Sequence, residues 1–330
     1  MKSAEFKPSF KTAPVLSLDR DVLLFIFKLN ADIFSDENSL KGTRLASQVC
    51  RDWRDAILET PSLWGRLIDL DQLVSSTDDW KAEVLRRSGD ASLWIRRTGI
   101  IFETRPTYTE PIQEFFFSVL NKHWDRIEQL VVSMDVGGLN GELWSAIYRP
   151  SPHLRVFSLD LHAFAMDPTS TPSSKTLFSG YAPVLHTFDG AVIQFELQAP
   201  WFSSLRSIQL GARLTFSEIL HAFNLMPRLE SIQIDQAKPI NLHAMEMSHL
   251  PRLHLQNLHQ IRLSSNLTTC AAFLEYITPA HGCSINIHAV ISPDESPIDS
   301  GHFATFVRRL SKLAGDLLES EYSHRWCLPM

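Results

Sequence analysis

Histidines and carboxylates could carry chemistry in this sequence, so their spacing decides whether a metal or catalytic site is expected. His243, His249, His254 and His259 crowd one region, and histidine nitrogens are common zinc ligands. No acidic or cysteine ligand shares their spacing, and the same region also fits a strand and its connections. The sequence lacks the signatures of a phosphate-binding loop, a dinucleotide fold, a nucleophile elbow and a helical zinc protease. We therefore expect no catalytic residue, no metal and no cofactor.

The composition is that of an ordinary globular protein: 330 residues, 44% hydrophobic and 21% charged. Its formal net charge is −6, and its arginine pairs are scattered among acidic residues rather than forming a basic stripe. This pattern argues against a nucleic-acid partner. No apolar run reaches the ~18 residues of a membrane span, and no apolar core follows the first lysines as in a secretory signal. We expect no membrane partner.

The four cysteines, Cys50, Cys270, Cys283 and Cys327, lie far apart, and none forms a C-x-x-C pair. This spacing argues against a zinc cluster and against a redox pair. Reduced thiols fit best, which predicts a cytoplasmic or nuclear protein.

Among the elements that the sequence predicts, the stretch from Leu16 to Trp64 has the clearest pattern. All six residues from Val22 to Phe27 are apolar, so no face of that helix turn can be left to water. A second helix is predicted from Thr43, a plausible N-cap, to a residue before Thr60 and Pro61, since the residue before proline avoids the helical region. About fifty residues cannot bury both helices alone, so another protein or the rest of the chain must cover them.

The second helix contains Val-Cys-Arg-Asp-Trp at residues 49–53, and a closing Leu-Trp follows at residues 63–64. The first helix and the residues before it contain Leu18, Asp21, Leu23, Ile26 and Phe27. With these residues the stretch resembles an F-box, the module by which substrate receptors of Skp, cullin and F-box (SCF) ubiquitin ligases bind a Skp-family adaptor. Asp19 stands where the family usually has proline.

The resemblance implies a three-helix F-box-like domain at residues 15–64 that contacts a Skp-family adaptor and, through it, a cullin. The residues that it places at or just behind this contact are Leu18, Asp21, Val22, Leu23, Ile26, Phe27, Val49, Cys50 and Trp53.

After Trp64 short apolar strands alternate with helix-length segments, the pattern of an α/β fold. Apolar residues recur at i, i+3 and i+5, as in Leu205, Ile208 and Leu210, and these triplets start 20 to 31 residues apart. The spread straddles the period of leucine-rich repeats, although the asparagine that usually follows the repeat's strand is missing. We expect residues 65–300 to form an irregular leucine-rich-repeat-like α/β solenoid with a parallel sheet; an ordinary α/β domain is the alternative.

The polar positions between the apolar ones would line the outer face of such a sheet, a surface suited to binding another protein. A solvated strand face would also be polar there without any function. The candidate substrate-binding residues on this face are Ser158, Asp160, Asp189, Gln209, Gln233, Asp235 and Arg262.

The remaining segments are predicted to be loops and ends. Residues 1–14 fit a flexible arm, and residues 167–175 and 291–300 are rich in turn formers. Residues 301–330 are predicted to contain a helix, from His302 to Leu318, that caps the open end of the repeats, followed by a tail.

The two halves together predict a substrate-recognition subunit of an SCF ubiquitin ligase that catalyses nothing itself. Its partners would be the adaptor and a protein substrate. The alternatives are a leucine-rich-repeat binding scaffold without ubiquitin transfer, and an enzyme with a pocket at the carboxyl ends of the parallel strands.

Overall fold

The computed structural model describes residues 18–99, 110–134, 142–161, 176–191, 193, 195–211, 214–235 and 250–289. The predicted arm at 1–14, the loops at 167–175 and 291–300 and the capping helix at 302–318 lie outside these residues. The chain divides into two units, unit 1 (Met1–Arg96) and unit 2 (Arg97–Met330). Each unit is described by itself.

Unit 1 begins with helix α1 (Arg20–Asn30), which contains the predicted all-apolar run. The Asp19 carboxylate caps this helix, since its Oδ1 accepts a hydrogen bond from the Asp21 amide at 2.8 Å. An acidic N-cap therefore starts the helix at the position where the F-box pattern has proline. Leu23 and Phe27 face the interior of the unit.

The single helix predicted from Thr43 to before Thr60 is wrong, because the chain forms two helices there, α2 (Ser39–Ala46) and α3 (Arg51–Leu58). A turn separates them, and Cys50 is fully extended with φ −153° and ψ 172°. The Ser47 hydroxyl donates to the Arg44 carbonyl at 2.7 Å, a local bond that competes with the helix. The end before Thr60 is confirmed, and a short helix α4 (Pro61–Trp64) follows.

The rest of unit 1 alternates strand and helix as expected. Its first strand has only two residues, because the Asp69 carboxylate accepts a hydrogen bond from the Asp71 amide at 3.0 Å and so starts a helix. The elements are β1 (Ile68–Asp69), α5 (Leu70–Leu73), α6 (Asp78–Arg87) and β2 (Leu93–Arg97), and β1 pairs in parallel with β2.

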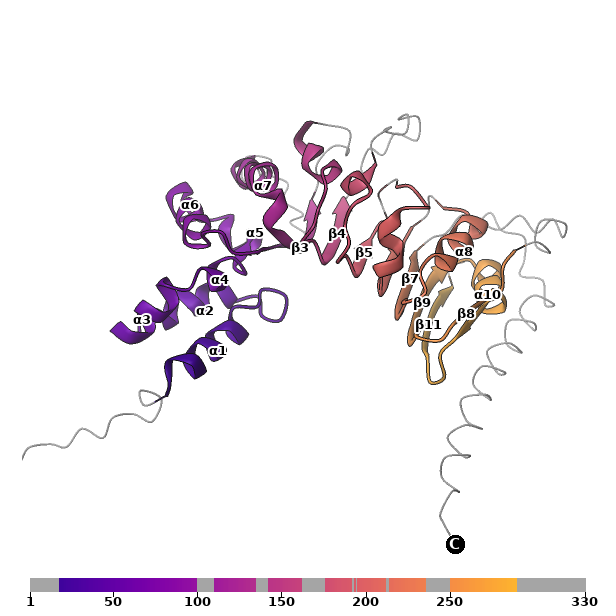
Figure 1. Ribbon diagram of the computed structural model, residues 1–330, viewed down its shortest axis with the longest axis horizontal. Helices are drawn as coiled ribbons and strands as arrows, with labels where there is room; N and C mark the ends of the chain where they lie inside the picture. The colour runs from indigo at the N-terminus through magenta and orange to yellow at the C-terminus, as the bar shows by residue number, and fades with distance from the viewer. Residues whose placement is uncertain are drawn as a thin grey trace, which may run out of the picture. The chain divides into compact units, whose positions relative to one another are not determined.

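Unit 2 contains a large parallel sheet whose neighbouring strands follow one another along the sequence, as Figure 1 shows. Every pairing between these strands is parallel where the structure describes it, which confirms the predicted α/β class. The strands are β3 (Ile127–Met134), β4 (Val156–Leu161), β5 (Thr187–Asp189), β6 (Ser207–Leu210), β7 (Ser231–Asp235), β9 (Gln260–Ser265) and β11 (Ser284–Ala289).

Helices lie along one side of this sheet (Figure 1). The α-helices in the described ranges of unit 2 are α7 (Glu110–Lys122), α8 (Phe216–Asn224) and α10 (Leu267–Tyr276). Other connections contain short 3-10 turns in their described parts: η3 (Trp124–Arg126), η4 (Glu142–Tyr148), η5 (Leu177–Gly180) and η6 (Pro200–Ser204). A small parallel pair, β8 (Leu253–Leu255) with β10 (Ile277–Pro279), was not expected from the sequence.

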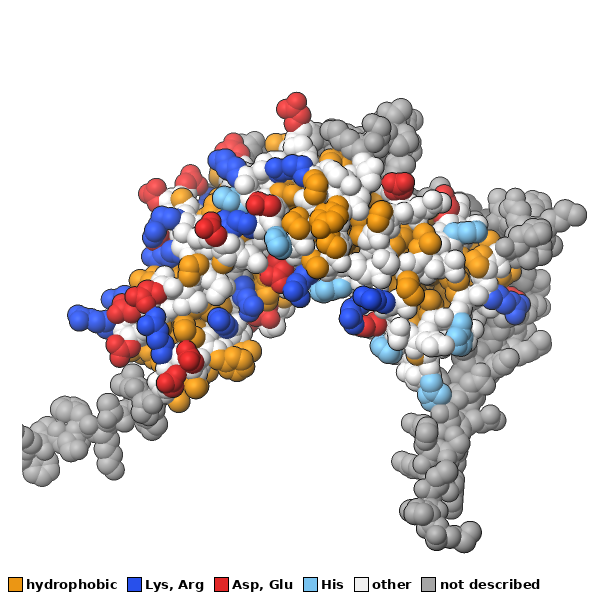
Figure 2. All heavy atoms as spheres, viewed as in Figure 1, with side chains coloured by type: hydrophobic (Ala, Val, Ile, Leu, Met, Phe, Trp, Pro, Cys, Tyr) orange, Lys and Arg blue, Asp and Glu red, His pale blue; other side chains and the backbone are white. Residues whose placement is uncertain are grey.

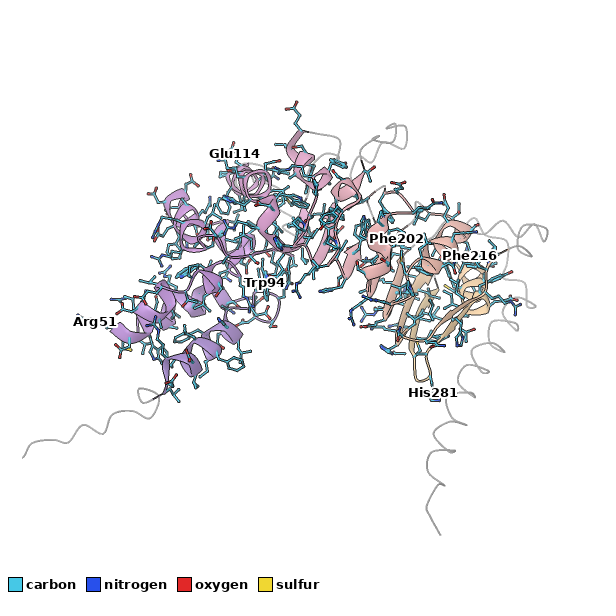
Figure 3. The ribbon with its side chains drawn as sticks, in the orientation of Figure 1. Arg51, Trp94, Glu114, Phe202, Phe216 and His281 are labelled. Atoms are coloured by element: carbon cyan, nitrogen blue, oxygen red, sulfur yellow. The ribbon has the colours of Figure 1, made fainter. Side chains whose placement is uncertain are left out.

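The core of unit 2 lies between the sheet and these helices. Register brings the middle residue of each apolar triplet into one buried row, and the rings of Phe157 and Phe188 stack within it at 5.8 Å. Figure 3 shows Phe202 and Phe216 on the helical side, and both are buried. The row contains Leu130, Phe157, Phe188, Ile208, Ile232 and Ile261.

Thr215 starts α8 through a reciprocal capping box. Its hydroxyl accepts from the Glu218 amide at 3.3 Å, and the Glu218 carboxylate accepts from the Thr215 amide at 2.8 Å. We expect Thr215→Ala to lower the free energy of unfolding by about 1 kcal/mol, because one helix amide loses its partner. Urea unfolding measures this loss. An equal loss in Ser217→Ala, at the second residue of the helix, would show that the cap is not its cause.

Candidate functional site

Helix α1 leaves one apolar face uncovered in unit 1. Val22, Phe25 and Leu29 are 45%, 61% and 61% exposed, while Leu23 and Phe27 on the opposite face are buried. The three exposed residues are spaced i, i+3 and i+7, so they lie along one side of the helix, and we call them the α1 stripe. Figure 2 shows apolar side chains at the surface of this part of unit 1.

A second exposed apolar pair follows on α2 and the turn after it. Leu45 and Val49 are 54% and 59% exposed, although helical spacing alone would have placed them in a buried stripe. The extended residue Cys50 breaks the helix between Val49 and Trp53, so these two side chains do not belong to one face. The Trp53 ring instead packs edge-on against Phe27 at 5.1 Å and holds α3 on α1.

The structure thus divides the predicted adaptor-binding residues into three groups. Exposed at the surface are Leu18, Asp21, Val22 and Val49. Half-buried are Ile26, Cys50 and Trp53, whereas Leu23 and Phe27 lie behind the surface in the core.

Phe25, Leu29 and Leu45 are exposed apolar residues that are not among the predicted adaptor-binding residues. Their signal was present: Val22, Phe25 and Leu29 already share one helical face. Within an all-apolar run, however, periodicity cannot say which face is the uncovered one.

A groove of about 400 Å³ lies between the start of α1 and α3. Leu18, Leu23, Trp53 and Ala56 supply its apolar surface. Its α3 side carries three carboxylates, of which Glu59 pairs with Arg20 at 2.7 Å. The other two carboxylates are those of Asp52 and Asp55. We call this feature the α1–α3 groove.

In unit 2 the predicted substrate-binding residues share the polar face of the sheet. Strand register places five of them in one row across five strands: Ser158, Asp189, Gln209, Gln233 and Arg262. Asp160 and Asp235 each lie two residues further along their strands, on the same face. The sequence therefore predicted which side chains lie side by side, because the register follows the apolar triplets.

Hydrogen bonds link neighbouring strands on this face. The Ser158 hydroxyl donates to the Asp189 carboxylate at 2.8 Å. Both Gln209 and Gln233 donate from Nε2 to one carboxylate oxygen of Asp235, at 3.0 and 2.9 Å. The face is thus an ordered polar surface in which side chains from different strands fix one another.

Burial raises the pKa of the Asp189 carboxyl above its ordinary value. Hydrogen bonds from the Ala191 amide and the Ser158 hydroxyl oppose this change, and the negative charges of Asp160 and Asp235 add to it. The fold therefore favours the protonated form, and the stability which that form contributes is lost as the pH rises through the raised pKa.

We expect Asp189→Asn to become progressively more stable than the native chain between about pH 3 and pH 7. The amide is neutral at every pH, whereas the buried carboxylate must ionise. The amide oxygen can still accept from the Ala191 amide, and the amide nitrogen can donate to the Ser158 hydroxyl. Thermal unfolding of both chains across this range measures the difference. A difference that does not change with pH would contradict the assignment.

The other candidate ligands form no site in the described ranges. His254 and His259 are exposed, whereas His243 and His249 lie outside these ranges. Cys50, Cys270 and Cys283 are unpaired, and burial raises the pKa of the Cys270 and Cys283 thiols to about 11, so they remain protonated. Among the residues described, no group of three or more His, Cys, Asp or Glu side chains could hold a metal ion. No helix in this part of the chain is long and apolar enough to cross a bilayer.

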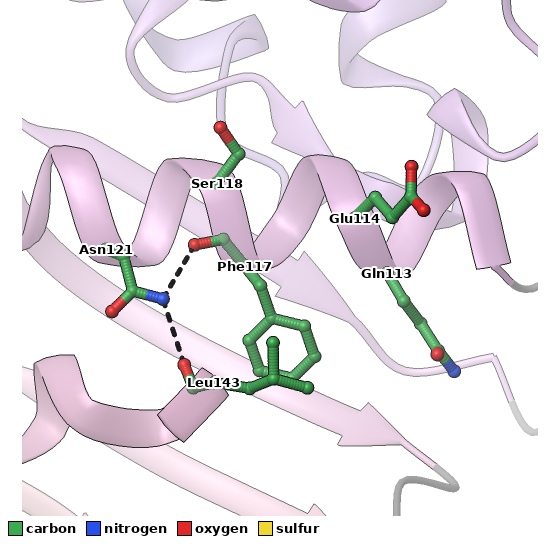
Figure 4. Close-up of a pocket in the computed structure, with 6 residues that line it drawn as sticks. All are labelled: Gln113, Glu114, Phe117, Ser118, Asn121 and Leu143. Carbon is green, nitrogen blue, oxygen red and sulfur yellow. Dashed lines mark hydrogen bonds between the residues drawn. The ribbon is translucent and has the colours of Figure 1, made fainter. Parts of the chain in front are cut away.

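A surface groove of about 610 Å³ also lies between α7 and η4. Figure 4 shows that the Asn121 amide spans it, donating to the Phe117 carbonyl at 3.0 Å and to the Leu143 carbonyl at 2.9 Å. Glu114 is the one ionisable side chain among its described lining residues. Acid–base catalysis needs at least one proton donor and one acceptor in reach of a substrate, and this groove does not offer such a pair.

The chain matches no known protein-family model and no curated protein sequence.

Proposed function

We propose that unit 1 is an F-box-like module that docks on a Skp-family adaptor. The observation that carries this proposal is the uncovered α1 stripe. Phe25 and Leu29 each expose 61% of their surface on one face of a helix whose other face is fully used in the core. Contiguous exposed apolar surface of this kind marks protein-binding sites in soluble proteins.

Adaptor contact with this module would bury the α1 stripe together with Leu45 and Val49. These positions coincide with or adjoin the residues on which the F-box resemblance rests, in particular Val22 and the Val-Cys-Arg-Asp-Trp segment. Large apolar residues surrounded by charged ones, here Asp21, Lys28 and Arg44, are typical of the centre and rim of such interfaces.

Unit 2 would then present the substrate. Its strands pair in parallel and in sequence order, and their apolar triplets lie in shared rows, as in an irregular leucine-rich-repeat solenoid. The polar face that contains Asp189, Gln209, Gln233 and Arg262 would contact the protein substrate. We propose that this protein is the substrate-recognition subunit of an SCF ubiquitin ligase in the cytoplasm or nucleus. It would act by raising the local concentration of substrate near the ubiquitin-loading enzyme.

Co-expression of the native chain with a Skp-family adaptor tests the first half of this proposal. We expect a complex of equal stoichiometry that also retains a cullin when one is supplied. A folded native chain that is recovered without adaptor would overturn the proposal. If adaptor binds but the abundance of proteins captured by unit 2 does not rise on proteasome inhibition, the chain is a binding scaffold without ubiquitin transfer.

A further inference from the structure

The α1–α3 groove combines an apolar floor with uncompensated negative charge. Leu23 and Ala56 form buried parts of its surface, and the half-buried Trp53 adds an aromatic ring. Asp52 and Asp55 are exposed on α3, and neither has an ion-pair partner among the residues that the structure describes. An occupant with both apolar and positively charged side chains would complement this groove.

The segment of the chain that precedes the groove has this chemistry. Residues 1–17 contain Lys2, Lys7 and Lys11 against one acidic residue, Glu5, and the two aromatic residues Phe6 and Phe10. The lysines and phenylalanines alternate closely from residue 6 to residue 11, so a short extended stretch presents both kinds of side chain.

Residue 18 also connects this segment directly to the groove. Leu18 is itself one of the groove's lining residues, and Asp19 enters α1 with an extended backbone, φ −59° and ψ 147°. Six residues lie between Lys11 and Leu18, and the seven steps from one Cα to the other span at most about 25 Å when fully extended. A segment tethered at the rim reaches the groove at an effective concentration in the millimolar range, far above that of a second copy in solution.

We propose that residues 1–17 fold back onto the α1–α3 groove of the same chain. A phenylalanine of this segment covers the apolar floor, and its lysines lie beside Asp52 and Asp55. This occupancy of the groove does not depend on the proposed function of unit 1. Its consequence rests on the proposed function: because the exposed Leu18 and the half-buried Trp53 belong to the predicted adaptor contact, the segment competes with the adaptor and lowers its apparent affinity.

Zero-length carbodiimide coupling of the full chain tests the occupancy directly, because it joins an amine to a carboxylate only when the two are in contact. We expect Lys7 or Lys11 to couple to Asp52 or Asp55 about tenfold more than to Asp79 or Asp90, two carboxylates that are also exposed in unit 1. Mixing isotope-labelled and unlabelled chains separates coupling within one chain from coupling between copies. Equal coupling to both pairs of carboxylates, or coupling between copies, would overturn the proposal.

A variant of residues 1–17 gives a second test that does not depend on coupling chemistry. Replacing Phe6, Lys7, Phe10 and Lys11 by serine should increase amide hydrogen exchange in α3, with unchanged exchange in α6. Unchanged exchange in both helices would contradict occupancy. Adaptor titration of the same variant is read separately: loss of protection in α3 without tighter adaptor binding leaves the occupancy standing and counts against the adaptor proposal.

Discussion

A chain with the double substitution Val22→Asp and Phe25→Asp is expected to fold but not to be captured by a Skp-family adaptor, which captures the native chain. Both side chains are exposed on the α1 stripe, so charge there disturbs no core contact. In the complex it would place two carboxylates in a desolvated apolar contact. A residue at the centre of an interface typically contributes about 2–4 kcal/mol, so losing even one of the two contacts should lower the affinity ~30-fold to ~1,000-fold.

The matched control carries the same charge change on exposed apolar residues of unit 2. Val184 and Leu225 are each 41% exposed, close to the 45% of Val22. Val184→Asp with Leu225→Asp should leave adaptor capture unchanged. Equal loss in both double variants, or retained capture by the α1 variant, would show that the α1 stripe is not the contact. Circular dichroism and the melting temperature confirm that each chain is folded.

Asp69→Ala is expected to destabilise unit 1 by about 3–5 kcal/mol, the usual result of removing one member of a buried ion pair. The Asp69 side chain is fully buried and pairs with Arg96 at 2.6 Å. It also accepts hydrogen bonds from the Asp71 amide and from Gln72 Nε2, both at 3.0 Å. Its loss would leave the Arg96 charge without its partner and α5 without its cap.

Guanidinium unfolding of the full chain measures this loss, with Asp79→Ala on the exposed start of α6 as the control. We expect the control to change stability by less than about 0.5 kcal/mol. Pairing Asp69→Leu with Arg96→Met should cost less than either Asp69→Ala or Arg96→Ala, because it removes both charges together. A loss below about 1 kcal/mol in Asp69→Ala would mean that the pair contributes little to unit 1.

The sequence predicted the sheet of unit 2 well, because its signal is local and repeated. Each triplet such as Leu229, Ile232 and Ile234 alternates with polar residues, and a parallel strand buried on one side requires this pattern. The same triplets set the register, which is why Gln209 and Gln233 were expected side by side and lie so. The helical connections were harder, since several became short 3-10 turns, such as η6, where Pro200 starts the turn.

The helices of unit 1 show what the sequence could not specify. Leu45, Val49 and Trp53 recur every four residues, which favours one continuous helix. The hydrogen bond from the Ser47 hydroxyl to the Arg44 carbonyl and the extended backbone of Cys50 interrupt that helix. In the all-apolar run, Phe25 and Phe27 have the same residue type, but Phe25 is 61% exposed and Phe27 only 4%. Only packing against α3, through the Phe27–Trp53 contact, distinguishes the two faces.

Amide hydrogen exchange on the purified chain, with and without a Skp-family adaptor, measures whether unit 1 binds the adaptor. We expect the adaptor to protect α1 and residues 45–53 and to leave exchange in the strands of unit 2 unchanged. Protection confined to unit 2, or no protection anywhere in unit 1, would contradict the claim that unit 1 is an adaptor-binding module.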